Sequence, residues 1–248
     1  MMRALTAAVL VVAAGADCPK GCPRKCPAQD SVQSEFVKNS FEMDKFWGTY
    51  YEIAFHDSTQ PSKWPFAAKC QRSVKSPSPV GKGNYKDLFT LNFGVDKGVN
   101  AVCDLEFNIT EKPGVFMGHW QSSSPWNPDL TNIANTLVDV GVAENGTYEW
   151  TLEFQCKEFD EDDLRGRKGI RFTAVNFYHR KPIISDAELA NMKDRLTARG
   201  LGWIMELDGG LNMVNQNYCI EHSSYPPANA SRNWWCGQNP NEKAALIV

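Results

Sequence analysis

The stretch KFWGTYYEIAF, residues 45–55, gives the first clear indication of the fold. Aromatic side chains and Ile53 dominate it, and residues of these kinds favour β-strands. Gly48 interrupts the aromatics, and a glycine within a strand indicates a bend or the close approach of another segment. Glu52 follows two tyrosines, and alternation alone leaves open which face of the strand it occupies. We predict a buried strand that bends near its start.

The first sixteen residues have the features of a secretory signal peptide. Arg3 supplies the charge, residues 4–14 supply a short apolar core, and the triplet AGA supplies a small-residue cleavage site. We therefore predict a signal peptide over residues 1–16, a mature chain that starts at Asp17, and secretion. No later stretch approaches the roughly 18 apolar residues that a transmembrane helix needs, so no transmembrane segment is expected.

Eight cysteines in a secreted chain indicate a disulfide framework, and the sequence leaves their pairing open. They are Cys18, Cys22, Cys26, Cys70, Cys103, Cys156, Cys219 and Cys236. The first three follow a C-x3-C-x3-C spacing that differs from structural zinc sites, and the histidines are scattered. We therefore predict no metal ligands.

The net charge of the chain and its glycosylation motifs say more about its partners and modifications. The net charge is −3 and no basic block occurs, so the electrostatic footprint of a nucleic-acid-binding protein is absent. Three N-x-S/T motifs predict glycosylation, at Asn108, Asn145 and Asn229.

Two segments alternate strictly between apolar and polar residues, which is typical of antiparallel strands with one buried face. In the first segment the apolar face holds Val99, Ala101, Cys103, Leu105, Phe107 and Ile109. In the second segment it holds Tyr148, Trp150, Leu152, Phe154 and Cys156. The polar face of the second segment, expected in water, holds Thr147, Glu149, Thr151, Glu153 and Gln155. Further strands are predicted near 68–76, 85–95, 114–121, 133–142 and 169–179, which gives about eight in all.

One helix stands out after the strands. Ser185 and Glu188 form a capping box at the start of a helix over residues 185–200, and Gly200 is its predicted terminator. Its apolar residues fall on one face, so we expect it to pack on the outside of the sheet. That face holds Leu189, Met192 and Leu196.

The loops and termini complete the predicted organisation. Asn145-Gly146 predicts a type I′ hairpin turn. A loop is expected over 122–132 and a last extended segment near 203–214. Together the elements predict an all-β fold, an eight-stranded antiparallel up-and-down barrel with one helix on its outside. A Cys/Pro-rich arm (17–39), the barrel region (40–222) and an irregular tail (223–248) follow the signal peptide.

Within this pattern the opening stretch resembles the first-strand motif of the lipocalin family, G-x-W-Y-E. Gly48, Tyr51 and Glu52 match, and Tyr50 stands where the family has tryptophan. In that family the glycine lets the chain turn into the barrel, and the aromatic residue plugs its closed base beneath a basic residue from the last strand. The resemblance, which extends to apolipoprotein D-like members, implies that Arg180 packs on Tyr50.

The chain is most similar to the lipocalin domain of violaxanthin de-epoxidases. They share the spacing from the first-strand motif to Cys70, the Tyr178-x-Arg180 end of the last strand, and Cys219 after the helix. The resemblance implies a disulfide between Cys70 and Cys219. Cys236 is then left to pair with the N-terminal arm.

One departure from the de-epoxidases concerns catalysis. They carry aspartates just before the cysteine of the second strand, where this chain has Pro65, Phe66, Ala67, Ala68 and Lys69. Protonation of an epoxide needs an acid with a raised pKa. The chain lacks one in that segment, and Glu52 has no visible partner for such a role, so the prediction leans against an enzyme.

A closed barrel with an apolar lining predicts a carrier of a small hydrophobic ligand, such as a carotenoid, a retinoid or a fatty acid, without a cofactor. The expected lining is Phe89, Leu91, Phe93, Leu105, Phe107, Met117, Trp150, Leu152 and Phe154. The same side chains could fill a solid core instead, and the sequence does not decide. Two alternatives remain: a de-epoxidase-related enzyme acting on xanthophyll in a plastid lumen, and an interaction module that uses Trp126, Trp234 and Trp235.

Overall fold

The computed structural model describes residues 23, 25–58, 69–79, 81, 83–93, 99–120, 130–158, 171–207, 210–222 and 225. The predicted signal peptide, the sequon at Asn229, the segment 65–68, and the tail apart from Tyr225 lie outside the described residues.

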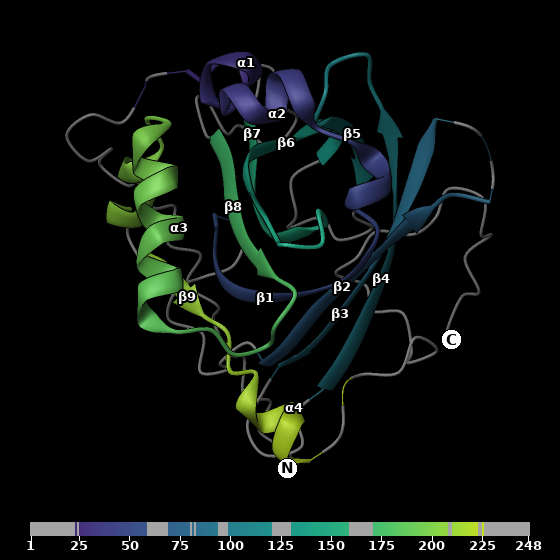
Figure 1. Ribbon diagram of the computed structural model, residues 1–248, viewed down its shortest axis with the longest axis vertical. Helices are drawn as coiled ribbons and strands as arrows, with labels where there is room; N and C mark the ends of the chain where they lie inside the picture. The colour runs from purple at the N-terminus through teal and green to yellow at the C-terminus, as the bar shows by residue number, and fades with distance from the viewer. Residues whose placement is uncertain are drawn as a thin grey trace, which may run out of the picture.

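Eight long strands form a closed antiparallel barrel (Figure 1). They are β1 (Gly48–Asp57), β2 (Lys69–Pro77), β3 (Asn84–Phe93), β4 (Val99–Ile109), β5 (Val115–Trp120), β6 (Leu130–Val142), β7 (Tyr148–Glu158) and β8 (Arg171–His179). Each strand pairs with the next along the chain, and β1 pairs with both β8 and β2. Closure of the sheet confirms the predicted up-and-down barrel.

The turn between β6 and β7 differs from the prediction. Gly146 has a φ of +82°, but Asn145 is absent from the described non-glycine residues with positive φ. A type I′ turn needs positive φ at both central residues. Instead the amide of Gly146 donates to the carbonyl of Ala143, and Ala143 donates to Thr147. The loop is one residue longer than predicted, with glycine in the left-handed position that closes it.

The helix α3 (Asp186–Ala198) lies on the outside of the barrel, as predicted (Figure 1). The capping box is formed, because the Ser185 hydroxyl accepts from the Glu188 amide and the Glu188 carboxylate accepts from the Ser185 amide. Gly200, with a φ of +74°, ends the helix. The buried residues of α3, Met192 and Leu196, belong to one apolar cluster with residues of β7 and β8.

The position of α3 overturns part of the predicted barrel lining. Trp150, Leu152 and Phe154 belong to the cluster that contains Met192 and Leu196, so they face the helix and not the interior. The two faces of β7 are therefore the reverse of the prediction. Its polar residues face the interior, where they are buried; these are Thr151, Glu153 and Gln155.

Met117 also faces outward. It lies opposite Asn108, which is exposed, whereas the neighbouring Gly118 lies opposite the buried Phe107. Residues directly opposite in an antiparallel pair share a face. The interior-facing set on β3 and β4 agrees with the prediction through Phe89, Leu105 and Phe107, because these strands pair without interruption.

The N-terminal arm closes one end of the barrel (Figure 1). It carries α1 (Gln29–Val32) and α2 (Glu35–Ser40), and the 3-10 helix η1 (Met43–Lys45) follows before β1. The disulfide between Cys26 and Cys156 ties it to β7. Val37 is fully buried in the same cluster as the barrel base, so this part of the arm belongs to the folded domain.

The chain after α3 returns to the barrel. The predicted extended segment near 203–214 is only partly extended: Gly202–Glu206 form the 3-10 helix η2, and Asn212–Met213 form β9 beside β1. The short helix α4 (Asn217–Glu221) follows, and Cys219 within it forms the expected disulfide with Cys70 of β2. In the part of the chain that the structure describes, no helix is long and apolar enough to cross a membrane.

Candidate ligand site in the barrel interior

The base of the barrel is closed by the residues of the opening motif. The Arg180 guanidinium lies over the Tyr50 ring, 3.8 Å from its centroid, and Tyr50 is fully buried. The three guanidinium nitrogens of Arg180 donate to the backbone carbonyls of Tyr148, Thr49 and Trp47, at 3.0, 3.1 and 2.8 Å. Arg180 therefore holds the end of β8 against the start of β1.

The role of Gly48 follows from this contact. A Cβ atom at Gly48 would lie 2.6 Å from Nη1 of Arg180, and the residue has a φ of +116°. Side chains are strained at such a φ, and no room remains for one here. The glycine in the opening stretch is thus required by the arginine that packs over it.

Aromatic rings fill the interior just above Tyr50. Tyr85 stacks on Phe107 with centroids 4.8 Å apart, and Phe46 stacks on Phe116 at 5.6 Å. All four are buried. A ligand cannot enter the barrel through this end without displacing them.

A buried ion cluster lies next to these rings. The Lys75 ammonium, with a fully buried side chain, is 2.7 Å from Asp87 and 3.1 Å from Glu153. It also lies 4.9 Å from the ring centroid of Tyr178 and 5.1 Å from that of Phe46. Burial by itself would lower the pKa of Lys75, but the two carboxylates outweigh burial and raise it, so the side chain stays charged.

Polar neighbours satisfy the carboxylates of this cluster. Ser73 donates to Asp87 at 2.5 Å, and Asn135 donates to Glu153 at 2.7 Å. Nε2 of Gln155 in turn donates to the side-chain oxygen Oδ1 of Asn135 at 3.3 Å. A buried charge is tolerated when it is paired and hydrogen-bonded, which explains why polar residues face inward on four strands.

Glu52 is the inward carboxylate without a cation. Its residue is 1% exposed, and its carboxylate accepts from Asn176 at 2.7 Å. None of the described residues forms an ion pair with it. Burial raises its pKa well above the ordinary value, and the charges of Glu153 and Asp57 add to the effect. Glu52 therefore holds a proton far more readily than an exposed glutamate does.

Two amide side chains near Glu52 have polar atoms without partners. Both Nε2 and Oε1 of Gln71 and Oδ1 of Asn176 are buried and make no hydrogen bond. Gln71 lies two residues from Ser73 on β2, which places it on the inward face. Buried polar groups are nearly always paired in native proteins, so these atoms indicate a place where a ligand or water binds.

On the opposite wall, three inward-facing apolar residues keep some exposure. Phe89, Leu91 and Leu105 are only half-buried, although the register places them on the same face as the buried Asp87. The interior is thus reached by solvent along β3 and β4. The side chain of Phe93, also expected in the lining, lies outside the described residues.

A group of potential metal ligands lies outside the barrel base: Glu149, His179 and Glu188 come within 4.8 Å of one another. The ammonium of Lys181 already lies between the two carboxylates, 3.2 and 3.5 Å away. The Lys181 amide also donates to Nδ1 of His179, which puts the imidazole proton on Nε2, the atom that faces the glutamates. A neutral histidine in this tautomer cannot bind a metal through Nε2, so the group is a salt-bridge cluster.

A separate cavity of about 260 Å³ lies on the outer face of β6 and β7. It is bounded by the arm at Cys26 and Pro27 and by Phe154 and Cys156 of β7. Phe154 faces away from the interior, so this cavity is distinct from the barrel site.

The comparison with solved structures agrees with this geometry. Apocrustacyanin C2 matches the chain with a TM-score of 0.50 and 10% sequence identity, covering 77% of this chain and 88% of that one. The chain has the lipocalin fold. No family model and no curated protein matches the sequence. At this identity the likeness concerns the fold alone, and the finer resemblance to violaxanthin de-epoxidases stays a prediction.

The interior site differs from the predicted one mainly in its polar residues. Of the interior polar groups, sequence reasoning considered only Glu52 and missed Lys75, Gln71 and Asn135. The sequence did contain a signal for this face: Ser73 and Lys75 lie two residues apart on β2, so they share one face of the strand. What the sequence lacked was a way to tell which face was inside.

Proposed function

We propose that the protein is a secreted lipocalin-type carrier that binds a small, largely hydrophobic molecule inside its barrel. One observation carries the proposal: the barrel is sealed at the Tyr50 end, while Phe89, Leu91 and Leu105 further along remain accessible from within. A barrel closed at one end with an accessible apolar wall is suited to enclosing a small ligand.

The three candidate ligand classes share an apolar body. Carotenoids, retinoids and fatty acids all have apolar bodies long enough to contact β3 and β4. They differ in the polar end that would meet Glu52 and Gln71. Glu52 and Gln71 therefore help to determine which ligand class the barrel binds.

Secretion is supported by two kinds of residue besides the predicted signal peptide. The two described disulfides fit an oxidising compartment. Asn108 and Asn145 are exposed, so a glycan at either position would meet no steric obstacle from the barrel core. A fluorescent fusion to residues 1–40 tests the route: export through the secretory pathway supports the proposal, and plastid fluorescence contradicts it.

Binding is tested by mass spectrometry of protein purified from its source, followed by titration of the emptied protein with an apolar fluorescent probe. Leu105→Trp adds bulk inside the barrel, and Met117→Trp is the matched control because it adds the same bulk outside. We expect probe binding to fall with the first variant and to persist with the second. Failure of any lipid or pigment to co-purify, together with no probe binding, would refute the carrier.

A second candidate is a de-epoxidase-related enzyme acting on xanthophyll in a plastid lumen. The observation that favours it is Glu52, a buried inward carboxyl group whose raised pKa suits a proton donor. Removal of an epoxide oxygen as water consumes two protons and two electrons, so the assay must supply a two-electron reductant with violaxanthin. Product formed by the wild type and abolished in Glu52→Gln would favour the enzyme over the carrier.

A further inference from the structure

Among the described residues, those that face the barrel interior carry more negative than positive charge. The buried inward residues near its middle include three carboxylates, Glu52, Asp87 and Glu153, and one ammonium, Lys75. Lys75 is already shared by Asp87 and Glu153. Glu52 forms no ion pair with any of the residues that the structure describes, and an unpaired charge in a low-dielectric wall is costly.

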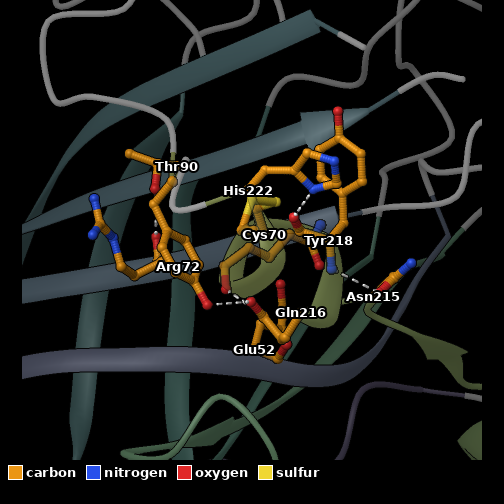
Figure 2. The surroundings of a disulfide bond; sticks show 11 residues. Glu52, Cys70, Arg72, Thr90, Asn215, Gln216, Tyr218 and His222 are labelled. Carbon is orange, nitrogen blue, oxygen red and sulfur yellow. Dashed lines mark hydrogen bonds between the residues drawn. A yellow bond between two sulfur atoms is a disulfide. The ribbon is translucent and has the colours of Figure 1, made fainter. Parts of the chain in front are cut away.

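Three buried polar atoms near Glu52 lack a partner: two acceptors, Oδ1 of Asn176 and Oε1 of Gln71, and one donor, Nε2 of Gln71. Nδ2 of Asn176 donates one hydrogen bond to the Glu52 carboxylate, at 2.7 Å. Gln216 holds Glu52 and Gln71 side by side, because its Nε2 donates to both backbone carbonyls, at 2.8 and 2.7 Å. Figure 2 shows Gln216 beside Glu52, next to the strand that carries Cys70. The disulfide of Cys70 fixes this wall.

We propose that the ligand of this barrel carries a protonated amine, which binds Glu52 and the oxygens of Gln71 and Asn176. The inference rests on the proposed carrier function and names its ligand class. An ammonium group has three donors and no acceptor, which matches a carboxylate flanked by two free carbonyl oxygens. The apolar remainder of the ligand lies along Phe89 and Leu105 on the facing wall.

The same charges argue against a ligand that brings a carboxylate to this end. Such a group would meet Glu52 and the negative field of Glu153, with Lys75 already paired. A hydroxyl group could donate one hydrogen bond but brings no positive charge to Glu52. Among equal apolar tails, the order of affinity is therefore amine first, alcohol second and fatty acid last.

Proton release is a second consequence. The groups that act on Glu52 are Asn176 of β8, Glu153 of β7, Asp57 of β1 and Lys75 of β2. Burial and the two acids raise its pKa, and Asn176 and Lys75 oppose them. Glu52 in the empty barrel therefore binds a proton more readily than an exposed glutamate does, and an ammonium ligand competes with that proton. Amine binding should release protons to the buffer.

The test compares three probes with the same twelve-carbon tail: dodecylamine, dodecanol and laurate. Each is titrated against the full-length mature protein by displacement of an apolar fluorescent probe. We expect dodecylamine to bind at least about tenfold more tightly than laurate, because a buried charge pair is strongly discriminating. Calorimetry in two buffers of different ionisation enthalpy measures the proton release.

Glu52→Gln is the decisive variant, since it is nearly isosteric with the protonated side chain and should fold. It should cost dodecylamine at least about tenfold in affinity, abolish proton release and leave dodecanol nearly unchanged. Glu106→Gln, on the outer face of β4, is the matched control and should change neither. Gln71→Met is a second variant that should weaken amine binding while the melting curve shows an intact fold.

The outcomes separate the two proposals. Equal binding of the three probes, or amine binding that survives Glu52→Gln, overturns the amine inference and leaves the carrier intact. Binding of none of the three, together with no binding of the fluorescent probe, overturns both.

Discussion

Truncation of Tyr50 and Arg180 tests how the barrel base is held. Tyr50 is fully buried between Phe46 and the Arg180 guanidinium, so Tyr50→Ala leaves a cavity that the closed base cannot fill by collapse. Truncation of large buried aromatics costs roughly 3–5 kcal/mol, and we expect a loss in that range. The measurement is the free energy of unfolding from urea denaturation.

Arg180→Ala removes two kinds of interaction. The stacking on Tyr50 contributes about 0.5–2 kcal/mol. Three carbonyls also lose their donor, at about 1 kcal/mol each, and water replaces part of that loss because the side chain is only half-buried. We expect a total of about 2–4 kcal/mol.

The double variant distinguishes this account from a coincidental contact. The stacking contact is counted in both single variants, so the double variant should lose about 0.5–2 kcal/mol less than their sum. Ligand affinity of the folded fraction should stay unchanged in Tyr50→Ala, because the site lies further up the barrel. Additivity within about 0.3–0.5 kcal/mol would refute the shared contact. A stable Tyr50→Ala protein that no longer binds ligand would give the tyrosine a direct role in binding.

Three further predictions concern the rest of the barrel. Replacing both Cys70 and Cys219 by serine should lower the free energy of unfolding by up to about 5 kcal/mol, since the bridge spans 149 residues, and thermal melts that match the wild type would contradict this. Lys75→Met should cost about 3–5 kcal/mol, because it leaves Asp87 and Glu153 buried without a cation, and an unchanged urea midpoint would count against the ion cluster. Glu52→Gln should stabilise the empty protein at neutral pH and not in acid. The pKa of Glu52 is higher in the folded than in the unfolded state, so its contribution is complete below the unfolded pKa and is lost as pH rises through the folded one; equal shifts in melting temperature at all pH values would disprove it.

Strand and helix positions could be predicted because each rests on a local pattern. The alternation in β4 and the capping box of α3 each depend on a few neighbouring residues, and both are formed. The first-strand motif identified Gly48, and the structure supplies the physical reason in the Arg180 contact.

The faces of β7 could not be predicted for an equally physical reason. Alternation separates two faces but does not say which one is inside a barrel. An apolar face was assumed to face inward, yet Leu152 and Phe154 are buried beneath α3 and the arm, on the outside. Glu153 is tolerated inside because Lys75, from a distant strand, neutralises it. Such pairing between distant strands leaves no local trace in the sequence.

The most direct test of the central claim is a crystal structure of the protein purified from its natural source. The account predicts ligand density inside the barrel, with an apolar body against Phe89 and Leu105 and its polar end beside Glu52. A barrel filled by its own side chains, or density confined to the outer cavity near Phe154, would contradict it.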